Sequence, residues 1–449
     1  MEVLKNANNK APTIGVIGLG YVGLPLALEF SLNGFDVIGM DINFDKVMKL
    51  KMGESLLGND ISTKLQLCLS SNSNTIFFTT EYSMISKCEA IIICVPTPLN
   101  EMREPDLSYL EDAVSNIRKH VRKNSLIVLE STSYPGTTED LLLSKFSDDG
   151  YIIGKDLYLC YSPERIDPGT LNNNITHIPK VIGGVTPKCL ERGINLYKAI
   201  VLKLIPVTST KTAEMTKLLE NTFRSVNIAF INEFALLCEK IGVNIWEVIK
   251  AASTKPYGFM SFYPGPGVGG HCIPVDPVFL SWRAKHHNFF SEFIEISQEI
   301  NRAMPNYVVQ KITEALNRNM KCINGSKLLL LGMTYKPNIA DYRESPSIEI
   351  YEMLNYLGAK ITVNEPNIDL IYDKKGNIIE NKELSYHELA NYDCIVILTA
   401  HSVYQPELIV KYADLIVDTR NLLDGYIDDK IVLLGAPDKN FDLKKLVAI

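Results

Sequence analysis

Short apolar runs alternate with helical patterns in the first part of the chain. A β-branched run at residues 13–18 is followed by glycines and then by an apolar-periodic stretch at residues 24–32, and a second run covers residues 35–40. This order is typical of strand, tight turn, helix and strand. Further strand-like runs at residues 89–95, 125–130 and 156–160 are separated by helical patterns such as residues 110–121. The alternation predicts a parallel sheet covered by helices.

The hydrophobic period changes in the middle of the chain. Apolar residues recur about every 3.6 positions between residues 210 and 249, and neither Gly nor Pro occurs there before Gly242, which predicts one long helix. A second helical stretch at residues 291–317 follows a loop rich in Gly and Pro at residues 257–277. The strand pattern then resumes, with a helix near residues 347–357 and strands at residues 327–332, 360–363, 393–399 and 415–417. We therefore predict two α/β domains joined by helices.

Composition narrows the class of protein further. The 449 residues argue for several domains, and 46% hydrophobic with 22% charged residues is an ordinary globular composition. The 45 basic and 52 acidic residues give a net charge of −7, which disfavours a broad nucleic-acid or membrane footprint. The nine cysteines contain no C-x-x-C pair, so we expect reduced thiols and no metal site. No apolar run approaches the roughly 20 residues of a membrane span, and we expect a cytoplasmic enzyme.

A glycine motif lies between the first strand and the first helix. Gly18, Gly20 and Gly23 form G-x-G-x-x-G, in which small residues let the backbone approach a pyrophosphate at the positive end of a helix. Asp41 ends the second predicted strand and is placed to accept hydrogen bonds from a ribose 2′-hydroxyl. An acid there repels a 2′-phosphate, so the pattern favours NAD over NADP, although Lys46 nearby weakens the preference.

Three further groups are candidates for chemistry, and pattern alone leaves each open. Cys272 follows a glycine-rich loop that permits close approach of a substrate to a thiol, but such a cysteine is more often structural, and we treat His271 as structural. Lys217, Asn221 and Arg224 share one face of the long helix, which is a polar site or a solvated face. Glu164 is a turn residue or a general base.

The motifs of the chain resemble those of the nucleotide-sugar 6-dehydrogenases. The resemblance rests on GLGYVGLP at residues 18–25, VPTP at 95–98, ESTSYPGTT at 130–138, SPERIDPG at 162–169, KLLENTFR at 217–224, GPGVGGHCIPVDP at 265–277 and GMTYKPNIADYRESPS at 332–347. It implies two Rossmann-like domains joined by a long central helix and a helical connector, with a homodimer or higher homo-oligomer. We place the NAD-binding domain at residues 1–209, the connector with the cysteine loop at 210–320 and the UDP-binding domain at 321–449.

The same resemblance implies roles for individual residues. Cys272 resembles the nucleophile, Lys217, Asn221 and Asp276 its polar surroundings, and Glu164 the base that activates water. The residues that resemble cofactor contacts are Gly18, Gly20, Tyr21, Val22, Gly23, Asp41, Lys46, Thr97, Thr132 and Arg343. Those that resemble nucleotide-sugar contacts are Glu164, Arg165, Ile166, Lys217, Asn221, Arg224, Phe262, Tyr263, Gly269, Tyr335, Lys336 and Arg420.

The residues around Cys272 also bear on the substrate. Enzymes that act on UDP-glucose typically read GGSCFPKD, whereas this chain has GGHCIPVD, which favours an N-acetylated hexosamine. The segment at residues 255–272 resembles UDP-N-acetylglucosamine 6-dehydrogenases, with UDP-N-acetylmannosamine, UDP-N-acetylgalactosamine and UDP-glucose as alternative substrates. The implied reaction is a four-electron, NAD-dependent oxidation of the C6 alcohol to an acid. A non-catalytic protein that binds NAD or a nucleotide sugar is the alternative from another class.

Overall fold

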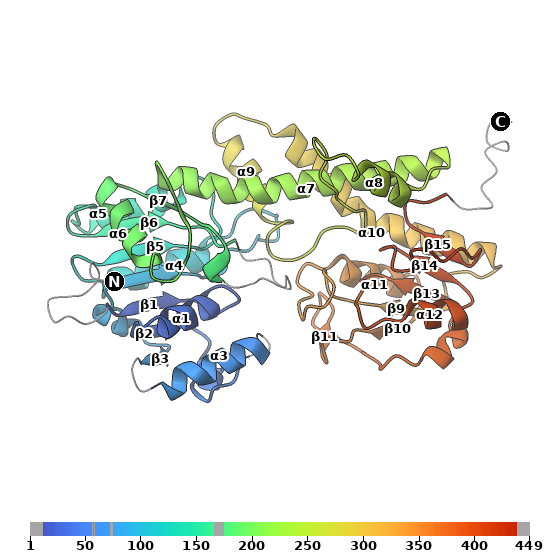
Figure 1. The fold of residues 1–449 in the computed structure, drawn as a ribbon, viewed down its shortest axis with the longest axis horizontal. Coiled ribbons are helices and arrows are strands. Elements are labelled where there is room, and N and C mark those ends of the chain that lie inside the picture. The colour runs from blue at the N-terminus through green and yellow to red at the C-terminus, as the bar shows by residue number, and fades with distance from the viewer. Residues whose placement is uncertain (1–11, 56, 58, 72–74, 166–174, 438–449) are drawn as a thin grey trace. The chain divides into compact units, whose positions relative to one another are not determined.

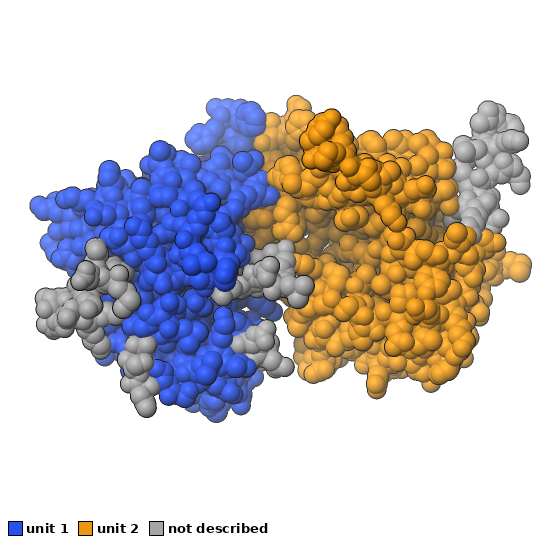
Figure 2. All heavy atoms as spheres, viewed as in Figure 1, with its two compact units in different colours: residues 1–220, 278–289 blue, residues 221–277, 290–449 orange. Residues whose placement is uncertain are grey.

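The computed structural model describes residues 12–437 except 56, 58, 72–74 and 166–174. Within it the chain forms two compact units, coloured separately in Figure 2. The first comprises residues 1–220 and 278–289, and the second residues 221–277 and 290–449. Each unit contains one main parallel or mostly parallel sheet with helices on both faces (Figure 1). The predicted α/β architecture is confirmed.

Among its described residues, the first unit has a sheet of eight strands. Their order is β3 (Ile76–Thr79), β2 (Val37–Met40), β1 (Ile14–Ile17), β4 (Ala90–Ile93), β5 (Leu126–Leu129), β6 (Tyr158–Tyr161), β7 (Lys180–Gly184) and β8 (Leu204–Val207). The first six are parallel, in the order 3-2-1-4-5-6 of a dinucleotide-binding fold. β7 runs antiparallel to β6, and β8 runs parallel to β7. The sequence pattern did not indicate this reversal.

Successive strand residues point to opposite faces and so feed two cores. On β1, Ile14 and Val16 join one hydrophobic cluster, whereas Ile17 joins the other. The helices of this unit are α1 (Gly23–Leu32), α2 (Phe44–Lys51), α3 (Asn59–Ser70), α4 (Ser108–Arg118), α5 (Ser144–Asp148) and α6 (Pro187–Tyr197). The first three and α6 cover one face, and α4 and α5 cover the other.

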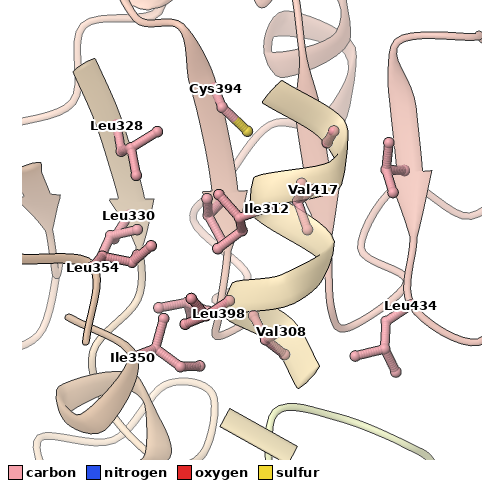
Figure 3. Packing of buried hydrophobic residues seen from close by; sticks show 14 of the residues in the cluster. Val308, Ile312, Leu328, Leu330, Ile350, Leu354, Cys394, Leu398, Val417 and Leu434 are labelled. Carbon is pink, nitrogen blue, oxygen red and sulfur yellow. The ribbon is translucent and has the colours of Figure 1, made fainter. Parts of the chain in front are cut away.

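The second unit repeats the parallel α/β design. Its strand order is β10 (Lys360–Asn364), β9 (Lys327–Leu331), β13 (Cys394–Ile397), β14 (Ile416–Asp418) and β15 (Ile431–Leu433), and a small hairpin pairs β11 (Ile371–Tyr372) with β12 (Ile378–Ile379). Helices α8 (Ile245–Ala252), α10 (Glu292–Arg318) and α11 (Pro346–Tyr356) cover one face, and α12 (Pro406–Tyr412) covers the other. Figure 3 shows Val308 and Ile312 of α10 against Leu330 and Val417 of the sheet.

Two helices carry residues of both units. α7 (Thr210–Ile241) has 32 residues and confirms a long helix, but it does not continue to residue 249. Gly242 has φ +78° and ends it, and α8 begins separately at Ile245. α9 (Asp276–Lys285) follows the loop that contains Cys272. Among the described residues, no helix combines the length and apolar character that crossing a membrane requires.

Candidate active site

The three glycines of the turn in the first unit are required for different structural reasons. Gly18 has φ +90°, and a Cβ there would lie 2.6 Å from the Cys94 carbonyl oxygen. A Cβ on Gly23 would lie 1.8 Å from the carbonyl oxygen of Gly18. By contrast, a Cβ on Gly20 would meet no protein atom within 4 Å. The first and third glycines therefore satisfy the packing of the turn itself, while the second leaves open space where a ligand can approach the backbone.

The acid that the sequence singles out lies beside this turn. Asp41 follows β2, and its Oδ2 accepts a hydrogen bond of 3.0 Å from the backbone N–H of Leu19. The same oxygen forms an ion pair of 2.8 Å with Lys46 Nζ. Tyr21 and Val22 lie between the open Gly20 position and α1. An open backbone turn, a helix N-terminus and an adjacent carboxylate fit the pyrophosphate and ribose of NAD.

Two threonines lie at the carboxyl edge of the first sheet. Thr97 follows β4 and Thr132 follows β5, and both are buried. Thr132 Oγ1 accepts a hydrogen bond of 2.7 Å from Nζ of Lys217, which is also buried and lies on α7. The structure thus brings Thr132 and Lys217 together, although the sequence separates them by 85 positions.

The Glu164 loop is tied to α7 by an arginine. Glu164 follows β6, and its Oε1 accepts a hydrogen bond from the backbone N–H of Arg165. Arg165 donates from Nε and Nη2 to the two carboxylate oxygens of Glu220 at 3.0 and 2.6 Å, and from Nη1 to the carbonyl of Pro179 at 2.7 Å. In this structure the guanidinium therefore ties Arg165 to α7 and to the Pro179 carbonyl. Ile166 lies outside the described residues.

Cys272 lies four residues before Asp276, a buried residue of the second unit. Asp276 begins α9, and its backbone N–H donates to the Cys272 carbonyl at 2.8 Å. The fully buried Asp276 carboxylate accepts a hydrogen bond of 2.6 Å from Asn221 Nδ2. Cys272 is partly exposed, whereas six of the other cysteines, residues 68, 88, 160, 189, 238 and 394, are buried. Partial exposure is one of the conditions that a reactive thiol requires.

The loop before Cys272 packs closely on the second sheet's loops. A Cβ on Gly269 or Gly270 would lie 2.6 or 2.8 Å from Tyr335, and Gly270 N–H donates to the carbonyl of Arg343 at 2.9 Å. A Cβ on Gly265 would lie 2.4 Å from Nη1 of Arg420. These glycines allow the cysteine loop to lie against residues that follow β9 and β14. Sequence spacing alone did not indicate these contacts.

Two arginines of the second unit that the sequence singles out are held by neighbouring groups. The Arg420 Nε donates to the Leu398 carbonyl at 2.9 Å, and burial lowers the Arg420 pKa to about 10 against the opposing effect of Asp418. Arg343 forms a bidentate interaction with Asp341 at 2.9 and 2.6 Å. Lys336 and Arg224 are both partly exposed, on the loop after β9 and on α7.

Two aromatic residues precede the cysteine loop. Phe262 packs edge to face on Phe223 of α7, with 5.8 Å between ring centroids. Tyr263 stacks on Trp246 of α8 at 6.0 Å and remains exposed. The two side chains are therefore anchored on different helices.

Sequence reasoning missed a polar network that supports the loop before Cys272. The Gly265 N–H donates to Oδ1 of the fully buried Asn232, whose Nδ2 donates to Asn301 Oδ1, each at 3.0 Å. Asn301 in turn donates to the carbonyl of Ser225 at 3.0 Å. The signal was the presence of amides on the apolar faces of α7 and α10, where a polar residue needs a partner.

These features define a class: an NAD-dependent dehydrogenase with two α/β units and a candidate cysteine nucleophile. Models of the UDP-glucose/GDP-mannose dehydrogenase family match the chain in three parts: the NAD binding domain at residues 12–201, the central domain at 211–303 and the UDP binding domain at 329–425. The chain belongs to this family. It is an NAD-dependent UDP-sugar 6-dehydrogenase.

Individual relatives cover most of the chain. It is 37% identical to a UDP-N-acetyl-D-mannosamine dehydrogenase of Methanococcus vannielii, over 96% of this chain and 99% of the relative. It is also 37% identical to a UDP-N-acetyl-D-glucosamine 6-dehydrogenase of Pseudomonas aeruginosa, over 79% and 82%. The structure of a UDP-D-ManNAc dehydrogenase from Pyrococcus horikoshii matches with a TM-score of 0.84 and 33% identity, over 94% of this chain and 99% of that chain.

Proposed function

We propose that this enzyme oxidises the C6 alcohol of a UDP-N-acetylhexosamine to the carboxylate in two steps, with Cys272 as the covalent nucleophile. The observation that carries the proposal is the partly exposed Cys272 four residues before the fully buried Asp276, whose carboxylate accepts a hydrogen bond from Asn221. A simple alcohol dehydrogenase needs no nucleophile, whereas retaining an aldehyde and oxidising it again is facilitated by a covalent adduct. The overall reaction consumes one alcohol, two NAD⁺ and one water, and yields one carboxylate, two NADH and three protons.

In the proposed mechanism the chain supplies the proton transfers and the nucleophile. NAD supplies the hydride acceptor when bound. Asp276 and Lys217 form a relay, through water, that removes the proton of the C6 hydroxyl as hydride leaves. The Cys272 thiolate then adds to the aldehyde carbon, and a second hydride leaves the thiohemiacetal to give a thioester. Lys217 and Asn221 stabilise the oxyanions.

Hydrolysis of the thioester completes the reaction. Glu164 takes a proton from water, the resulting hydroxide adds to the acyl carbon, and the carbon–sulfur bond breaks to release the Cys272 thiolate. The position of Glu164 on a loop at the carboxyl edge of the first sheet supports this role, because the glycine turn and Thr132 lie at the same edge.

The configuration of the hexosamine is a finer question. The segment at residues 255–272 favours UDP-N-acetylglucosamine, whereas the Methanococcus relative is named for the mannosamine isomer. Identity does not separate the two, because both relatives quoted above are 37% identical to the chain. We retain UDP-N-acetylglucosamine as the proposed substrate and UDP-N-acetylmannosamine as the second candidate.

We also propose a homodimer in which α7 contributes to the interface. Apolar side chains on this helix are 38 to 63% exposed, among them Leu219, Phe230, Phe234 and Leu237. Monomeric proteins rarely expose contiguous apolar patches of this kind. Light scattering of the purified protein tests the dimer: a monomer mass over the working concentration range would contradict it.

A panel of UDP-sugars tests the activity and the substrate together. UDP-N-acetylglucosamine, UDP-N-acetylmannosamine, UDP-N-acetylgalactosamine and UDP-glucose are each incubated with NAD, and NADH and acid are quantified. We expect two NADH per acid and the highest kcat/KM with UDP-N-acetylglucosamine. One NADH per product would refute the covalent two-step route, and a preference for the mannosamine isomer would establish the second candidate.

A further inference from the structure

A buried ion pair lies at the carboxyl edge of the first sheet and has no role in the reaction described above. Glu130 follows β5, Lys180 is the first residue of β7, and their side chains are 0% and 6% exposed. Lys180 Nζ donates to Glu130 Oε2 at 2.9 Å, and the hydroxyl of Tyr197 on α6 donates to Glu130 Oε1. Burying such a pair costs desolvation free energy that hydrophobic residues of the same volume would not.

The strand register brings this pair to Glu164. β6 and β7 are antiparallel and pair Tyr161 with Gly183. Glu164, three residues after Tyr161, therefore faces Lys180, three residues before Gly183. Side-chain distances agree with this register, because Lys180 Nζ lies 3.9 Å from Glu164 Oε2. The Glu164 side chain is only 9% exposed. One cation therefore lies between two carboxylates.

The charges around Lys180 favour its protonated form. Burial alone disfavours a charged lysine, but Glu130 and Glu164 outweigh burial and raise the Lys180 pKa. Burial raises the pKa of Glu130, against the lowering effect of Lys180. Burial also raises the pKa of the nearby Cys94 thiol well above its usual range, so this thiol stays neutral.

Neutral and cationic neighbours complete the surroundings. Tyr197 of α6 also remains neutral because burial raises the pKa of its hydroxyl. Besides Lys180, a second cation, Lys217 of α7, lies close enough to influence the pKa of Cys94. Lys217 donates its hydrogen bond to Thr132. Arg165, beside Glu164, is committed to Glu220. The cation near the Glu164 carboxylate is therefore Lys180, whose Nζ lies 3.9 Å from Glu164 Oε2.

We propose that Lys180 is a positioning residue that holds Glu164 in place and supplies a positive charge beside its carboxylate, and that Glu130 and Tyr197 fix Lys180 in this position. The inference rests on the proposed role of Glu164 as the base of thioester hydrolysis. An ionised carboxylate is needed because only that form takes a proton from water. In a site with little water, the nearby ammonium supplies the stabilisation that solvent would otherwise provide.

Two substitutions of opposite sign test the proposal. Lys180→Met removes the positive charge 3.9 Å from the Glu164 carboxylate, so we expect the acid limb of the hydrolysis rate to move to higher pH by about one unit or more. The direction of this shift stays the same even when Glu130, which has lost its cation in the variant, takes up a proton. Glu130→Gln removes the competing carboxylate, leaves Lys180 to Glu164 alone, and moves the acid limb to lower pH. Loss of structure alone does not produce shifts of opposite sign.

The assay follows hydrolysis separately from hydride transfer. The full-length enzyme is mixed rapidly with NAD and the best UDP-sugar of the panel, quenched at intervals, and the acyl adduct on Cys272 is followed by intact mass over a range of pH. Lys180→Arg keeps the charge and is expected to retain the wild-type pH profile. Lys123→Met is the matched control, since Lys123 is 72% exposed and pairs at 3.7 Å with Asp156 in the same unit.

The outcomes separate this inference from the proposed function. If Glu164→Gln neither accumulates the adduct nor slows turnover, the assignment of Glu164 as the base fails. If Glu164→Gln accumulates the adduct but Lys180→Met and Glu130→Gln both keep the wild-type acid limb, the positioning role of Lys180 is overturned. Should Lys180→Met not fold, Glu130→Gln alone decides, because an unchanged or alkaline-shifted limb in that variant contradicts the proposal.

Discussion

Substitution of Gly23 by alanine should weaken NAD binding through the backbone of the turn. The added Cβ would lie 1.8 Å from the Gly18 carbonyl oxygen, whereas ordinary carbon–oxygen contacts are about 3.3–3.6 Å. The turn must therefore open by roughly 1.5 Å, the difference between these distances. The atom it meets belongs to the backbone and cannot rotate away as a flexible side chain would.

The magnitude follows from the cost of overpacking, which is about 1–3 kcal/mol. If the free variant relaxes by opening and NAD requires the closed turn, this cost appears in binding, and the Kd for NAD rises about 5- to 150-fold at roughly 1.4 kcal/mol per tenfold. Isothermal titration calorimetry with NAD measures the change. Thermal unfolding measures the part that remains in the free protein.

Gly20→Ala is the matched control for this experiment. Its Cβ meets no protein atom within 4 Å, and Gly20 does not have a positive φ, so we expect the melting temperature of the free protein to be unchanged. NAD binding is expected to weaken in this variant as well, because the methyl group enters the space left for the pyrophosphate. A Gly23→Ala protein with the wild-type melting temperature and the wild-type Kd would refute the reasoning.

Three further predictions concern other parts of the site. Asp41→Ala removes the ribose acceptor and frees Lys46, so we expect the preference of kcat/KM for NAD over NADP to fall, and an unchanged ratio would argue against the assignment. Cys272→Ala should abolish acid formation while calorimetry still detects NAD binding, and undiminished acid would exclude the covalent route. Asn301→Leu leaves the buried Asn232 amide without its acceptor and should cost about 1–3 kcal/mol of stability; a denaturant midpoint equal to that of the wild type would contradict this.

The parts of the fold that local pattern encodes could be predicted from the sequence. The 3.6-residue period of α7 and the apolar runs of β1, β4 and β5 are local properties, and each predicted element exists in the structure. That Asp41 lies near Gly18, Gly20 and Gly23 could also be predicted. The parallel strands β1 and β2 end at the same edge of the sheet, and this fixes where the acid must lie. The structure places Asp41 beside the turn, hydrogen-bonded to Leu19.

Contacts that depend on register and on distant pairing could not be predicted. In the sequence, Lys180 is simply a polar residue before an apolar run. Its partner Glu130 lies 50 positions earlier. The interaction of Arg165 with Glu220 likewise joins a loop to a helix 55 positions away. A cationic side chain is equally compatible with a phosphate ligand and with a carboxylate of the chain, so composition and spacing could not distinguish these two uses of Arg165.

The reversal of β7 explains how a lysine reaches this edge at all. In parallel strands the residues at the carboxyl ends meet at one edge, which is where the glycine turn, Thr132 and Glu164 lie. The first residue of a parallel strand would lie at the opposite edge. Because β7 is antiparallel to β6, its first residue, Lys180, lies at the carboxyl edge of β6 instead. An antiparallel strand added to a dinucleotide-binding sheet thereby supplies a buried cation at the edge where Glu164, the proposed hydrolytic base, lies.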